Sequence, residues 1–180
     1  MSINFKQNYF ELFGLPVQFD VDNAMLMAAF RKLQAAHHPD RFASGSDEEK
    51  RIAQQVTSFI NTAQETLSNP RLRARYLLSL KGVDLNDEVD TTSDMAFLMS
   101  QMERREALEQ VTAADDPLSA IDALSDDVRR EKHELEQAFV IALEAEQLED
   151  AKQAVLKLKF FERLMDEIRQ LEARLEDDAI

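Results

Sequence analysis

One short stretch of the sequence has the chemistry of a binding or reactive site. His38, Pro39 and Asp40 are consecutive, and Arg41 follows them. Pro39 cannot donate a backbone hydrogen bond and restricts the residue before it, so it ends the helix that leads into this stretch. The result is a tight polar corner where an imidazole, a carboxylate and a guanidinium lie beside one rigid ring. Such a corner is a poor catalytic site but a good docking point for another protein.

Two helices are predicted to hold this corner. The first starts at Asn23, and the second starts at Ser46 with a Ser-x-x-Glu capping box, after a loop over residues 42–45. Two short helices complete the unit: one over residues 9–13, between Asn8 and Gly14, and one from residue 71 to residue 80. The apolar residues predicted to face the core are Leu26, Phe30 and Leu33, then Ile52, Val56, Phe59, Ile60, Ala63 and Leu67, then Leu72, Tyr76, Leu77 and Leu80.

A corner with the sequence His-Pro-Asp between two antiparallel helices resembles the signature of the J domain. J domains activate heat-shock ATPase chaperones of the DnaK class. The outer face of the first long helix carries Arg31 and Lys32, and Arg41 adds a third cation beyond the corner. Alone, these cations would be an ordinary solvated face. Beside this corner they favour a docking surface.

The composition favours an all-α, soluble protein. Three glycines and four prolines among 180 residues leave little room for an all-β fold. Residues 1–80 carry nine Lys or Arg against eight Asp or Glu, whereas residues 81–180 carry twelve against twenty-seven. This asymmetry predicts two units with different partners and argues against nucleic-acid binding. The chain has no cysteine, no apolar run of about 20 residues and no signal-peptide pattern, so we expect a cytoplasmic protein.

The second half is predicted to be an antiparallel three-helix bundle. We expect a J domain over residues 1–81, a linker over residues 82–93, and the bundle over residues 94–180, with Ser93 capping its first helix. Asp116 and Pro117 begin the second helix, and a break at Glu146 and Gln147 precedes the third. The predicted core residues are Ile121, Leu124, Val128, Leu135, Phe139 and Leu143 in the second helix, and Ala151, Val155, Leu158, Phe161, Met165, Ile168 and Leu175 in the third.

The first bundle helix carries more apolar residues than a bundle core needs. Residues 95–103 place methionine and other apolar side chains around nearly the whole circumference, although a bundle buries one stripe. The extra face either packs on the J domain or binds a partner protein, since methionine suits adaptable surfaces. On the third helix, Phe160 and Leu164 lie roughly 100° from the core stripe, on a flank.

The three histidines do not form a metal or catalytic site. His37 and His38 are adjacent, so their side chains point in different directions on a helix. His133 lies among charged residues on a polar face. Because no catalytic motif or phosphate-binding loop is present, we expect neither an enzyme activity nor a bound metal or cofactor.

The whole chain resembles the iron–sulfur cluster co-chaperone family, HscB. The resemblance lies in residues 9–16, 38–42, 69–82 and 96–99, in the same order as in the family. It implies an L-shaped all-α fold with the J domain packed on a three-helix bundle. It also implies two partners. One is the cluster scaffold protein, IscU, which the bundle binds. The other is a specialised heat-shock ATPase, HscA, which receives the scaffold and whose ATP hydrolysis is stimulated, so that the cluster moves to apoproteins.

The resemblance also implies which residues contact each partner. Met102 stands where a leucine is common, which conserves volume. The cysteine pair of some relatives is absent, so no metal site is expected. Two other interpretations remain open: a J protein that serves a different client, and a purely structural helical adaptor. The implied contacts with the ATPase are Arg31, Lys32, His38, Pro39, Asp40 and Arg41, and those with the scaffold are Leu98, Met99, Met102, Glu103, Glu106 and Phe160.

Overall fold

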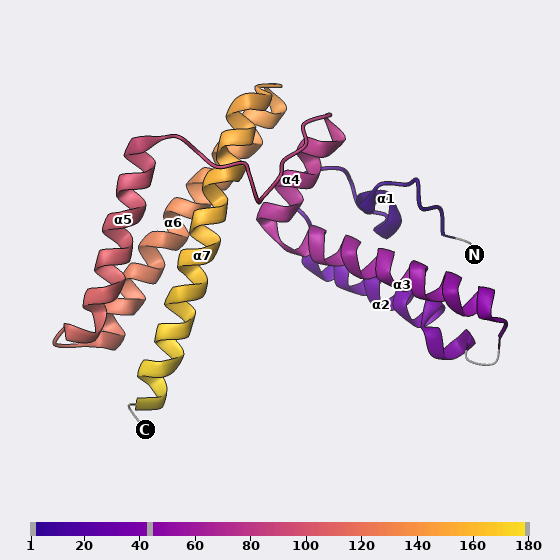
Figure 1. The fold of residues 1–180 in the computed structure, drawn as a ribbon, viewed down its shortest axis with the longest axis horizontal. Coiled ribbons are helices and arrows are strands. Elements are labelled where there is room, and N and C mark those ends of the chain that lie inside the picture. Colours follow the sequence, from indigo (N-terminus) through magenta and orange to yellow (C-terminus); the bar gives the residue numbers. More distant parts are fainter. Residues whose placement is uncertain (1–2, 43–44, 179–180) are drawn as a thin grey trace. The chain divides into compact units, whose positions relative to one another are not determined.

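The computed structural model describes residues 3–42 and 45–178, and all regular structure in these ranges is helical. The chain divides into two compact units, Met1–Lys81 and Gly82–Ile180. The predicted all-α class is therefore confirmed. None of the helices in the described ranges combines the length and apolar character needed to cross a bilayer. The elements are α1 (Tyr9–Phe13), α2 (Asn23–His37), the 3-10 helix η1 (Pro39–Phe42), α3 (Asp47–Ser68), α4 (Pro70–Leu80), α5 (Met95–Gln110), the 3-10 helix η2 (Val111–Ala113), α6 (Pro117–Glu144) and α7 (Leu148–Asp178) (Figure 1).

The first unit is built on an antiparallel hairpin of α2 and α3 (Figure 1). Leu26 of α2 and Ile60 of α3 are fully buried in it. Helix α1 packs against both long helices, and α4 packs against α3. The backbone N–H of Tyr9 donates to the Tyr76 hydroxyl at 2.9 Å, and the two rings stack with centroids 4.3 Å apart. The short helices α1 and α4 are thereby fixed to each other as well as to the hairpin.

Capping residues set the helix boundaries in this unit. Asn8 and Glu11 form a capping box at the start of α1, and Ser46 and Glu49 form another at the start of α3. Gly14 ends α1 in the left-handed conformation, with φ of 66°, which glycine adopts at little cost. The predicted cap at Ser46 is confirmed. Ala43 and Ser44 of the predicted loop lie outside the described residues.

Two of the predicted core positions in this unit are wrong. Ile52 and Leu80 are exposed, whereas Ala53 and Leu78 are buried. In α3 the buried stripe starts one residue later than its first apolar residue, because Ala53 rather than Ile52 is in phase with Val56 and Ile60. In α4 the side chain of Leu80 lies about 200° round the helix from that of Leu78, so both cannot face α3.

The second unit has a long α6–α7 hairpin as its framework, with α5 packed against both helices. Leu164 is buried, so its prediction as a flank residue is wrong. Leu164 follows Phe161 by three residues and precedes Ile168 by four, so with Met165 these residues occupy the i, i+3, i+4 and i+7 positions of one ordinary apolar stripe. The core of this unit contains Leu108, Val111, Ile121, Val128, Phe161, Leu164, Met165 and Ile168.

The segment before α5 follows the bundle closely. Leu85 and Thr92 are buried, and the Thr92 hydroxyl lies 3.3 Å from the side-chain oxygen of Gln153 on α7. Lys159 of α7 donates to the backbone carbonyl of Asp87. The cap of α5 is Asp94, whose carboxylate accepts from the Phe97 N–H at 3.1 Å, so the predicted cap at Ser93 is wrong. The residues predicted as a linker thus lie in the second unit and pack on α7.

Candidate partner-binding surfaces

The corner predicted from the sequence lies between α2 and η1. His38 ends α2 with φ of −57° and ψ of 132°, the extended conformation that a following proline favours. Its Nδ1 atom accepts from the backbone N–H of Asp40 at 3.3 Å and lies 3.4 Å from a carboxylate oxygen of the same residue. Both side chains are exposed. The side chain of Pro39 lies outside the part of the chain that the structure describes.

Two hydrogen bonds fix this corner to the helices beside it. The Arg41 guanidinium donates to the Ala35 carbonyl at 3.0 Å, which satisfies an acceptor in the last turn of α2. The Thr57 hydroxyl of α3 donates to the His37 carbonyl at 3.2 Å. Burial, together with the nearby Arg41 charge, lowers the pKa of the His37 imidazole. The exposed pair His38 and Asp40 therefore stands on a rigid support.

The predicted basic face of α2 lies on its exposed side. Arg31 and Lys32 are exposed, about two helical turns before the corner. Among the described residues, neither has an ion-pair partner, so both charges are available to a partner protein. Arg41 differs from them because its guanidinium is engaged with α2. The sequence did not indicate this engagement, which gives Arg41 a part in shaping the corner.

Helix α5 places its methionines outside and buries the polar side chain of Gln101 on its inner face. The side chains of Met95, Met99 and Met102 are 68%, 60% and 64% exposed, and their spacing of four and three residues puts them on one face. On the opposite face Gln101 is only 6% exposed, and its Nε2 atom has no hydrogen-bond partner among the described residues. Leu98 is half-buried at the edge between the two faces. A bundle helix would normally present the reverse pattern.

Polar pairs hold α5 against the hairpin. Arg104 pairs with Glu131 of α6, and Arg105 lies 3.4 Å from Glu167 of α7. At the start of the helix, Asp94 accepts from Lys157 at 2.7 Å. This hydrogen bond, together with the Phe97 N–H, lowers the pKa of Asp94. The inner side of α5 is therefore fixed in place, and its methionines remain exposed.

Phe160 belongs partly to the core and partly to the surface. It is half-buried, and its ring contacts the Phe97 ring edge-on, with centroids 5.6 Å apart and an angle of 87°. The structure thus brings Phe160 beside α5. Glu103 and Glu106 are exposed on α5. Met95 was not among the predicted contact residues, although its helical spacing from Met99 was visible in the sequence.

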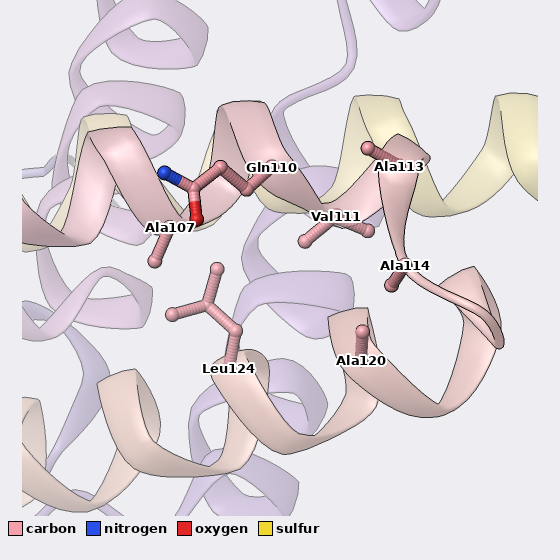
Figure 2. A pocket seen from close by; sticks show the side chains of 7 residues that line it. All are labelled: Ala107, Gln110, Val111, Ala113, Ala114, Ala120 and Leu124. Atoms are coloured by element: carbon pink, nitrogen blue, oxygen red, sulfur yellow. The ribbon is translucent and has the colours of Figure 1, made fainter.

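The second unit also has an open hollow of about 470 Å³ at the end of α5. The Leu124 side chain points from α6 towards Ala107 of α5 (Figure 2). Among the described residues, no group of three His, Asp or Glu side chains is placed to hold a metal ion. The hollow offers apolar surface and one amide rather than reactive groups. Its lining residues are Ala107, Gln110, Val111, Ala113, Ala114, Ala120 and Leu124.

Comparisons with known proteins identify the family. A family model described as the HSCB C-terminal oligomerisation domain matches residues 93–169. A relative from Shewanella halifaxensis, named Co-chaperone protein HscB homolog, is 47% identical over 174 residues, which are 94% of this chain and 99% of the relative. A relative of the same name from Vibrio cholerae is 45% identical over 169 residues, 93% and 98% of the two chains. The chain belongs to the HscB co-chaperone family.

Solved HscB structures share its fold. Chaperone HscB from Vibrio cholerae matches with a TM-score of 0.87 at 41% identity, over 94% of this chain and 99% of the other. Human co-chaperone protein HscB matches with a TM-score of 0.84 at 28% identity, over 96% and 85%. Membership of the HscB family gives this chain a co-chaperone role. The surfaces above are therefore candidates for contact with a chaperone and with its client.

The hydrogen bond from Thr57 should stabilise the corner of this HscB protein. Thr57→Val removes the hydroxyl donor but keeps the side-chain shape, so we expect the free energy of unfolding to fall by about 0.5–1.5 kcal/mol. The backbone N–H of Arg41, which donates to the His38 carbonyl at 3.0 Å within the corner, should also exchange its hydrogen faster. Thr57→Ser retains the donor and serves as the control. Unchanged exchange in the valine protein would show that this bond does not hold the corner.

Proposed function

We propose that this chain binds an IscU-like scaffold protein and delivers it to an HscA-like heat-shock ATPase in the cytoplasm. It stimulates ATP hydrolysis by that chaperone, and so promotes transfer of the iron–sulfur cluster to apoproteins. It acts as a regulator of its partner's activity and is not an enzyme itself. The observation that carries the proposal is that two exposed surfaces of different chemistry lie on the two units of one HscB-family chain.

The corner is the proposed contact with the ATPase. An exposed imidazole and carboxylate on a rigid corner can form hydrogen bonds with a partner at little entropic cost, because the backbone is already ordered. Arg31 and Lys32 would add long-range attraction to an acidic surface, which accelerates association and weakens as salt rises. Pro39 and Arg41 contribute by shaping the corner.

The outer face of α5 is the proposed contact with the scaffold. Met95, Met99 and Met102 expose apolar surface that the bundle does not use, and methionine adapts well to a partner. Leu98 and Phe160 extend this surface towards α7. Glu103 and Glu106 would form its polar rim. A different client could use the same surface, so a J protein for another client is the alternative function.

The first prediction from this proposed function concerns His38 in the corner. We expect His38→Gln to leave the fold intact and to abolish stimulation of the ATPase, because the imidazole is exposed and lies outside the core. Steady-state phosphate release by the partner ATPase measures this. His133→Gln replaces another exposed histidine, on α6, and should stimulate normally. Full stimulation by a folded His38→Gln protein would contradict the assignment of the corner.

The second prediction concerns the scaffold. We expect Leu98→Ala, Met99→Ala and Met102→Ala, combined, to abolish binding to an IscU-like scaffold, because each buried anchor contributes roughly 1–4 kcal/mol. Phe160 is left unchanged because its ring packs on Phe97. Calorimetric titration measures the affinity, with circular dichroism as the test of folding.

The control for this experiment is Ile141→Ala, which removes an exposed apolar side chain from α6. It should bind the scaffold as tightly as the unmodified protein. Equal binding by the triple variant would place the scaffold contact elsewhere. A protein that stimulates the ATPase but never binds the scaffold would favour the alternative client.

A further inference from the structure

The exposed methionines of α5 are also the most accessible thioethers of the second unit among the described residues. Met95, Met99 and Met102 lie on one face, and the other methionine described in this unit, Met165, is buried. The chain has no cysteine, so no thiol competes for an oxidant. Thioether oxidation depends on access, because the oxidant must reach the sulfur atom. An oxidant in solution can therefore reach the sulfur atoms of all three residues.

We propose that the methionine stripe, Met95, Met99 and Met102, is a reversible oxidation site that closes the scaffold-binding surface. The oxidant is a peroxide. A sulfur lone pair attacks one peroxide oxygen, the O–O bond breaks, and a sulfoxide S–O bond forms. With hydrogen peroxide the second oxygen leaves as water, so the sulfur loses two electrons and the peroxide gains them. Methionine sulfoxide reductases reverse the reaction.

Oxidation of the stripe would change the surface without disturbing the core. A sulfoxide is polar and accepts hydrogen bonds, so burying it against an apolar partner requires its dehydration. Three sulfoxides on one face would impose this cost three times on the same contact. Because the three side chains are more than half exposed, the packing of α5 on α6 and α7 does not depend on them.

This inference rests on the proposed scaffold contact, and the experiment separates the two. The full-length protein is treated with hydrogen peroxide, the sulfoxide at each methionine is measured by mass spectrometry, and the IscU-like scaffold is titrated calorimetrically. We expect sulfoxide at all three stripe positions, little at Met165, and an affinity for the scaffold at least about tenfold lower. Treatment with both classes of sulfoxide reductase should restore the original affinity.

Variants test whether the loss of scaffold affinity comes from oxidation of the methionine stripe. Replacing Met95, Met99 and Met102 by leucine removes the oxidisable sulfur, and replacing them by glutamine imitates the polar sulfoxide. Each protein is compared with its own untreated sample. We expect peroxide to leave the affinity of the leucine protein unchanged, and we expect the glutamine protein to bind weakly without treatment. Met25→Gln changes an exposed methionine of α2 and should not affect scaffold binding.

Four results of these experiments would overturn the proposed oxidation site. The proposal is overturned if the oxidised stripe binds the scaffold as before, or if the leucine protein loses as much affinity as the unmodified one. It is also overturned if peroxide oxidises Met25 but not the stripe. If the untreated protein does not bind the scaffold at all, the proposed function itself fails, and the proposed oxidation site fails with it.

Discussion

The bundle covers only one side of α5, and the exposed apolar face of the second unit depends on this constraint. A helix of 16 residues lies against a hairpin of two longer ones, and the contact uses Phe97, Gln101 and Leu108. Ion pairs from Arg104 and Arg105 fix the helix at its margins. The methionines then lie on the opposite face, which α6 and α7 do not cover. An ordinary amphipathic helix would have few apolar residues outside the face that it buries.

In the first unit, too, a rigid helical support holds exposed side chains, and here those side chains are polar. The hairpin of α2 and α3 forms the rigid part, and the corner at its end carries the exposed groups. Thr57 ties the corner to α3, and Arg41 ties it to α2. Ordering the backbone in advance lowers the entropic cost of binding for a small contact. The HscB chain thus exposes a polar corner and an apolar helix face, each on its own helical support.

The helices and most of their boundaries could be predicted because they depend on nearby residues, although the cap of α5 is Asp94 rather than Ser93. The Ser46 capping box, the Asp116 cap with Pro117, and the stop at Pro39 were all legible in the sequence. The phase of a stripe could not always be predicted. Adjacent apolar residues such as Leu77, Leu78 and Leu80 leave several faces possible, and only the neighbouring helix decides which is buried. Leu164 was missed for the same reason, because the adjacent apolar residues Leu164 and Met165 of α7 leave the phase of the buried stripe open.

The candidate site was predictable where residue type alone carries the chemistry. His38, Asp40 and the methionine-rich start of α5 were singled out from the sequence. The hydrogen bond from Thr57, the capping role of Arg41 and the contact between Phe97 and Phe160 were not, because each joins residues far apart in sequence or depends on a rotamer. Tertiary contacts of this kind need coordinates.

The proposed function requires one chain to carry both surfaces. The most direct test mixes two defective proteins, one with His38→Gln and one with the three alanine changes on α5. It then measures scaffold-dependent ATP hydrolysis by the HscA-like chaperone. We expect the mixture to stay as inactive as either protein alone, because neither chain can both hold the scaffold and activate the ATPase. Activity restored to the level of the unmodified protein would contradict it.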